Sequence, residues 1–230
     1  MDTPLSVNNM FSNTITDPTK VFDSIKLKNS FMAPLLINLL LASFTFYLYY
    51  DQLDAAWFID YIISVTPEEL APDQIEAMRK NVNPDMMKYF VPVVVAVIVV
   101  VLILLQALVL HIIGNVRNND VSYGEWFALI CWSSVPAILL GIMVILNLSI
   151  GDNSQLRPEF LNPISIATLF DLEMPGNFNK FMSMLSIITF WSIYLVASGV
   201  QRWSNSSTIA SYLVALSSFA LLWLIQIFVF

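Results

Sequence analysis

Charged residues are scarce in this chain. Only 12% of its 230 residues are Asp, Glu, Lys or Arg and 57% are hydrophobic, whereas an average soluble domain has roughly 25% charged residues. The mean hydropathy is +0.72. A water-soluble fold of this size would lack the polar side chains needed to cover its surface. The composition therefore predicts an integral membrane protein, with the lipid bilayer as its first partner.

Residues that carry out chemistry are equally scarce. One cysteine, Cys131, and one histidine, His111, exclude an intramolecular disulfide and a multi-cysteine metal site. Six glycines form no phosphate-binding cluster, and no HExxH, Gly-x-Ser-x-Gly or Walker sequence occurs. The net charge of −7 argues against nucleic acid. These absences predict a non-enzymatic protein without cofactor or metal, and the remaining enzyme hypothesis is a dyad of Cys131 and His111.

Five hydrophobic windows contain no Lys, Arg, Asp or Glu. A membrane-spanning helix needs about 20 apolar residues, because it rises about 1.5 Å per residue across a hydrocarbon core of about 30 Å. A lone strand would leave its backbone groups unpaired in lipid, so each window is predicted to be a helix. The chain is thus predicted to be an all-α, multi-pass bundle over 31–230, with spans at 31–50, 89–113, 127–148, 181–198 and 208–230.

The distribution of basic residues indicates an orientation. Lys and Arg number five on each side of the predicted membrane, so their total decides nothing. The five on the amino-terminal side lie in short segments close to span ends, where the positive-inside rule applies. We therefore expect a cytoplasmic amino terminus. The basic residues on this side are Lys20, Lys26, Lys28, Arg117 and Arg202.

The polar segments carry further helix signals. Residues 1–30 are predicted to hold an interfacial helix, capped by Asp17, that presents Val21, Phe22 and Ile25 to the bilayer surface; the alternative is a solvated lead-in. The first loop, 51–88, contains the amphipathic AAWFIDYIISV and a possible capping box beginning at Thr66. The second loop, 149–180, is rich in Asn, Pro and Asp and reads as a connector. Pro136 is expected to bend the third span.

Few polar residues occur inside the spans. Asn38 and Gln106 are each about 10 Å deep from the same membrane surface. We predict that they hydrogen-bond each other, since an unpaired amide in hydrocarbon is unfavourable; the alternative is that they line a transport path. Small residues at every fourth position predict close helix packing, either inside the bundle or in a homo-oligomer. These residues are Ser133, Ala137 and Gly141 in the third span, and Ser207, Ser211 and Ala215 in the fifth.

The polar run GNVRNNDVSYGEW, residues 114–126, lies between the second and third spans. It is either a tight cytoplasmic connector that begins at Gly114 or a site for a protein partner. The candidate partner-binding residues are Arg117, Asp120, Tyr123 and Glu125.

Three stretches of the chain carry a family resemblance: DPTKVFDSIKLKNSFMAPLLI, HIIGNVRNNDVSYGEWFALICWSSVPAILLGI and LVASGVQRWSNSSTIASYLVALSSFALLWLI. Their order and spacing resemble the Yip family of membrane proteins, in particular its compact bacterial branch. The resemblance implies five helices, a cytoplasmic amino terminus and the bacterial inner membrane. Eukaryotic members are associated with Rab-type GTPases, membrane traffic and organelle shape.

Two functions from different classes follow. The first is a non-enzymatic membrane protein that acts through contacts with other membrane proteins or lipids. The second is a small transporter or transporter subunit, although no ionisable residue lies in the predicted spans.

Overall fold

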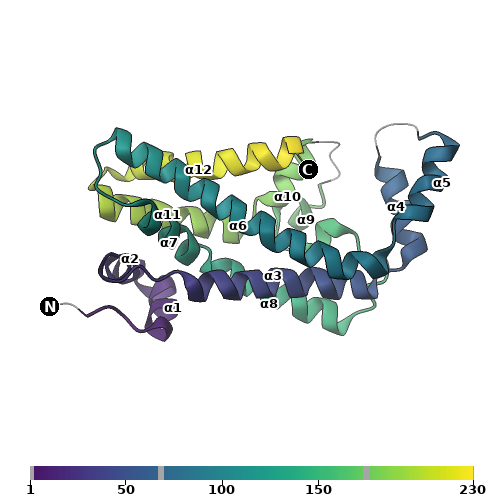
Figure 1. The fold of residues 1–230 in the computed structure, drawn as a ribbon, viewed down its shortest axis with the longest axis horizontal. Helices are drawn as coiled ribbons and strands as arrows, with labels where there is room; N and C mark the ends of the chain where they lie inside the picture. The colour runs from purple at the N-terminus through teal and green to yellow at the C-terminus, as the bar shows by residue number, and fades with distance from the viewer. Residues whose placement is uncertain (1–2, 67–69, 173–176, 230) are drawn as a thin grey trace.

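The computed structural model describes residues 3–66, 70–172 and 177–229 (Figure 1). Every secondary-structure element in these ranges is a helix. The β pairing found there is one isolated bridge between Ser165 and Ser186. The predicted all-α membrane helix bundle is confirmed.

The helices fall into three groups by their place in Figure 1. At the end of the bundle where the chain begins lie α1 (Val7–Thr16) and α2 (Pro18–Leu27). At the opposite end stand α4 (Ala55–Val65) and α5 (Pro72–Asn81). Between them run α3 (Met32–Gln52), α6 (Pro84–Val116), α7 (Tyr123–Ser133), α8 (Val135–Ile150), the 3₁₀ helix η1 (Pro158–Leu161), α9 (Ile166–Leu169), α10 (Asn177–Met184), α11 (Ile187–Ser204) and α12 (Thr208–Val229).

Four segments within the described residues are long and apolar enough to cross a membrane. They are α3, α6, the pair α7 and α8, and Thr208–Ile225 of α12. The remaining long helix, α11, has 18 residues but ends in a polar turn with Gln201 and Arg202. It packs against α12, α7, α8 and α2 and so belongs to the same bundle. The amphipathic helix predicted in the first loop is also confirmed, as α4. The capping box predicted at Thr66 includes residues 67–69, which lie outside the described residues.

The fourth predicted span, 181–198, does not form one helix. α10 ends at Met184 and α11 begins at Ile187, where the Ser186 hydroxyl accepts a hydrogen bond from the Thr189 amide at 3.2 Å. The Leu185 carbonyl accepts from the Ile166 amide at 2.8 Å, which ties this break to α9. The apolar window therefore spans a short helix, a capped turn and the first part of α11, because local capping outweighs continuous helix formation there.

The third predicted span is divided as well. α7 ends at Ser133 and α8 begins at Val135, with Pro136 in its first turn. Proline has no amide hydrogen to donate to the carbonyl four residues earlier, and its ring crowds that carbonyl. The predicted bend at Pro136 is confirmed.

The apolar face of α2 does not enter the bilayer surface. Val21, Phe22 and Ile25 are at most 1% exposed because α2 packs on α7 and α11. The Phe22 ring meets the Trp203 ring edge-on, with centroids 6.3 Å apart. Fully burying such side chains contributes about 1.5–3 kcal/mol each. The interfacial prediction is corrected: these residues cover one end of the helix bundle.

Small residues bring helices together inside the chain. A Cβ on Gly141 would lie 3.3 Å from the Cβ of Leu41, so α8 closely approaches α3. Ser133 belongs to α7 and is separated from Ala137 and Gly141 by the break, so the three do not share one continuous helix. On α12, Ser211 and Ala215 are buried, whereas Ser207 is exposed and precedes the helix. The small residues that are buried therefore pack inside the bundle.

Candidate functional site

The loop predicted as a partner site is partly occupied by the chain itself. Glu125 caps α7, because its Oε2 accepts from the Ser122 amide at 2.7 Å. Its Oε1 pairs with Lys26 Nζ at 2.9 Å, and this ammonium also lies 5.1 Å from the Trp203 ring centroid. Lys26 thereby ties α2 to α7. Glu125 therefore caps α7 and stabilises the packing of α2 against α7.

The other three loop residues differ in exposure. Tyr123 donates its hydroxyl to the Leu104 carbonyl at 3.1 Å, which joins α7 to α6. Arg117, which follows α6, and Asp120 are exposed. Neither forms an ion pair within the described part of the chain. The outward-facing part of this loop is thus Arg117 and Asp120.

The predicted hydrogen bond between Asn38 and Gln106 is not formed. The Asn38 amide donates to the Pro34 carbonyl at 2.9 Å and to the Ser134 hydroxyl at 3.1 Å. Gln106 is 6% exposed, and its Nε2 has no hydrogen-bond partner among the described residues. The break at Pro136 explains the difference, since it leaves Ser134 between two helices where its hydroxyl can reach α3. Depth alone does not specify which neighbour a polar side chain faces.

His111 and Cys131 do not form a dyad. His111 Nε2 lies 3.1 Å from the Asn115 side-chain amide, and its ring contacts Tyr123. Cys131 is fully buried in the core. No hydrogen bond joins these two side chains in the structure's described residues.

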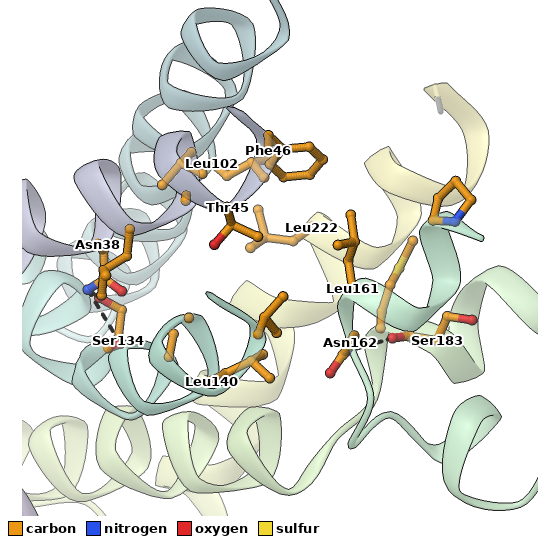
Figure 2. A pocket seen from close by; sticks show the side chains of 18 of the residues that line it. Asn38, Thr45, Phe46, Leu102, Ser134, Leu140, Leu161, Asn162, Ser183 and Leu222 are labelled. Atoms are coloured by element: carbon orange, nitrogen blue, oxygen red, sulfur yellow. Dashed lines mark hydrogen bonds between the residues drawn. The ribbon is translucent and has the colours of Figure 1, made fainter. Parts of the chain in front are cut away.

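A cavity of about 760 Å³ lies between the helices. Its volume falls within the roughly 300–1,000 Å³ typical of ligand sites. The walls are mainly apolar, and Figure 2 shows Leu140, Leu161, Leu222 and Thr45 around its open centre. Side chains from α3, α6, α8, α10, α12 and η1 contribute to the lining.

Polar side chains gather at two opposite ends of this cavity. At one end are Asn38 and Ser134, and at the other are Leu161 of η1, Asn162 and Ser183 of α10 (Figure 2). Gln106, Glu159 and Asn179 also line the cavity. Within the part of the chain that the structure describes, five lining residues have a buried side-chain atom without a hydrogen-bond partner. These atoms are Thr45 Oγ1, Gln106 Nε2, Glu159 Oε2, Asn162 Oδ1 and Asn179 Oδ1. Unpaired buried polar atoms are unfavourable, so they mark this cavity as a place where a ligand gains hydrogen bonds.

The second end comes from a segment that the sequence indicated only as a connector. Glu159 Oε1 accepts a hydrogen bond from the Tyr61 hydroxyl at 2.8 Å, which joins α4 to η1. Burial, and then this hydrogen bond, raise the pKa of the Tyr61 phenol above its usual value. Asn162 Nδ2 donates to the Ser183 carbonyl at 2.9 Å. The available sequence signals were the apolar residues spaced three and four positions apart in NFNKFMSM and the paired Ser-x-x-Thr caps at Ser165 and Ser186.

Fold and cavity together define a class: an all-α, multi-pass membrane protein with an open, mainly apolar cavity between its helices. The Yip1 domain matches residues 12–230, and the chain belongs to the Yip1 family. This family is not an enzyme family. No curated protein and no solved structure matches the chain.

Proposed function

We propose that this protein acts without catalysis, through contacts with lipids, and holds one amphiphilic lipid in the cavity between its helices. The observation that carries the proposal is the cavity itself, with mainly apolar walls and with polar atoms in its lining that have no hydrogen-bond partner among the described residues. An acyl chain suits the apolar walls, and a polar headgroup suits an end where hydrogen-bonding atoms lack partners.

The dimensions of the cavity support an acyl chain. Its lining follows α8 from Ser134 to Val144 and α3 from Asn38 to Phe46. At a rise of about 1.5 Å per residue, these stretches are about 15 and 12 Å long. A lipid tail lying between α3, α6 and α8 would be shielded from the bilayer on several sides, which distinguishes a bound lipid from the surrounding solvent lipid.

The proposal includes the setting of the protein. We place it in the bacterial cytoplasmic membrane with its amino terminus, α1 and α2 in the cytoplasm, as the basic residues near the span ends suggest. The end with Glu159 then lies toward the opposite surface. Other membrane proteins, including a second copy of this chain, would find Arg117 and Asp120 exposed on the cytoplasmic side.

Native mass spectrometry of the protein released from lipid nanodiscs tests this function. Ala42 lines the cavity, and Ala42→Phe is expected to fill it and to reduce the fraction of protein that retains a lipid. Ala77→Phe is the matched control, because Ala77 is exposed on α5. Equal lipid retention by the two variants and the unaltered protein would argue against the cavity as the binding site.

A second candidate is transport of the same kind of amphiphile across the bilayer. It is favoured by polar groups at both ends of the cavity and by Glu159, an ionisable residue that the second loop brings to the cavity lining. Movement of fluorescent lipid between leaflets of reconstituted vesicles separates the two functions. A transporter accelerates this movement and loses the acceleration in Ala42→Phe, whereas a protein that only binds lipid leaves the rate at that of empty vesicles.

A further inference from the structure

We propose that Glu159, Asn162 and Asn179 recognise a primary amine, so that the lipid in the cavity is of the phosphatidylethanolamine type. This inference rests on the proposed function, because it identifies the headgroup of the lipid bound there. It assigns the end of the cavity formed by η1, Asn162 and α10 as the headgroup site.

The first observation concerns hydrogen-bonding capacity. Three side-chain atoms at this end have no hydrogen-bond partner among the described residues, and all three are acceptors: Glu159 Oε2, Asn162 Oδ1 and Asn179 Oδ1. The Asn162 amide nitrogen is already used, since it donates to the Ser183 carbonyl, so its oxygen remains unpaired. A ligand that complements these three oxygens must therefore supply donors. A primary ammonium carries three N–H donors, which equals the number of unpaired acceptors.

The second observation concerns charge. Glu159 forms no ion pair within the described residues, and its carboxylate receives one hydrogen bond, from Tyr61. A partly buried carboxylate favours a cationic ligand and disfavours an anionic one. Hydroxyl headgroups offer donors but no positive charge, and a trimethylammonium offers charge but no donors. A primary ammonium offers both.

The third observation concerns the phosphate that such a lipid also carries. Arg157 is two residues before Glu159, is exposed, and rests its guanidinium 4.9 Å from the Phe160 ring centroid. It forms no ion pair in the described part of the chain either. Arg157 stands outside the cavity lining and Glu159 belongs to it. A zwitterionic headgroup bound here would have its ammonium toward Glu159 and its phosphate toward Arg157.

Headgroup competition tests the inference. The full-length protein is assembled into nanodiscs that contain equal amounts of phosphatidylethanolamine and phosphatidylcholine with identical acyl chains, and retained lipid is identified by native mass spectrometry. We expect phosphatidylethanolamine to be enriched about tenfold or more, the effect of one charge-assisted hydrogen bond. Glu159→Gln keeps an acceptor for Tyr61 but removes the charge, and it is expected to abolish this enrichment while lipid is still retained.

Two controls make the outcomes distinct. Glu76→Gln removes the same charge from an exposed site on α5 and is expected to keep the enrichment. Asn179→Ala removes one acceptor without altering charge and is expected to reduce it. Equal retention of both lipids by the unaltered protein, or an unchanged enrichment in Glu159→Gln, overturns the headgroup assignment and leaves the proposed function standing. If Ala42→Phe has no effect on lipid retention, the proposed function fails as well.

Discussion

Replacing Gly199 with alanine is expected to destabilise the bundle at the crossing of α11 and α7. A Cβ at this position would overlap Cδ1 of Leu129 and lie 3.0 Å from its Cδ2. Leu129 is fully buried, so its side chain has no free space into which to move. Overpacking of this kind costs about 1–3 kcal/mol. The overlap with Leu129 places this position in the upper part of that range, about 2–3 kcal/mol. Alanine regains about 1 kcal/mol of helix propensity, so the expected net loss of unfolding free energy is about 1–2 kcal/mol.

The assay is reversible unfolding in detergent micelles, followed by the loss of helical signal. Leu129→Ala alone leaves a cavity and is expected to cost about 2–5 kcal/mol. In the double variant the new methyl group enters that cavity, so the combined cost should be less than the sum by at least about 1 kcal/mol. Gly114→Ala is the matched control, because its Cβ would meet the Trp126 ring at an ordinary 3.4 Å. A neutral Gly199→Ala, or strict additivity in the double variant, would refute the reasoning.

Two further predictions concern the polar side chains at the cavity. Asn38→Leu is expected to show an energetic coupling of about 1 kcal/mol with Ser134→Ala and none with Gln106→Leu, as measured by double-mutant cycles in the same unfolding assay; coupling to Gln106 alone would contradict the observed bond. For Tyr61, burial and the hydrogen bond to Glu159 raise the folded-state pKa. The stability that this phenol contributes is therefore fully present below its ordinary pKa of about 10 and is lost as the pH rises through the folded value. The titration of Tyr61 is measured as the phenolate absorbance of the protein minus that of Tyr61→Phe. Glu159→Gln should lower the midpoint of this titration. A Tyr61 midpoint at the ordinary value would contradict the hydrogen bond between Tyr61 and Glu159.

Local sequence patterns predicted some elements closely. The period of AAWFIDYIISV corresponds to α4. The Ser122-x-x-Glu125 arrangement forms a capping box at the start of α7, although the third span was predicted from its hydrophobic run and not from this signal. Pro136 was expected to disturb the third span and does so, because a missing amide hydrogen acts within one turn. Such features depend on neighbours a few residues apart, and the chain itself specifies those neighbours.

The cavity was less accessible to sequence reasoning. Asn38 and Gln106 both line it, as polar residues inside predicted spans were expected to do under the transport alternative. Glu159, Asn162 and Asn179 come from a segment without clear periodicity, whose shape depends on contacts with α4 and on the bridge between Ser165 and Ser186. From the sequence, the apolar face of α2 could pack either on the bilayer or on other helices of the protein. In the structure it packs on α7 and α11.

The sequence by itself determined that this is an all-α membrane protein of the Yip1 family. Composition and the length of charge-free runs suffice for the all-α membrane class, because lipid cannot satisfy backbone hydrogen bonds and favours helices in such runs. The family rests on the residue pattern that the Yip1 domain matches over 12–230. Only the tertiary structure decided where the helices break, that Asn38 bonds Ser134, that α2 packs on protein, and that Glu159 reaches the cavity. These outcomes depend on which side chains meet across helices far apart in the sequence. Hydrophobic periodicity does not specify such contacts.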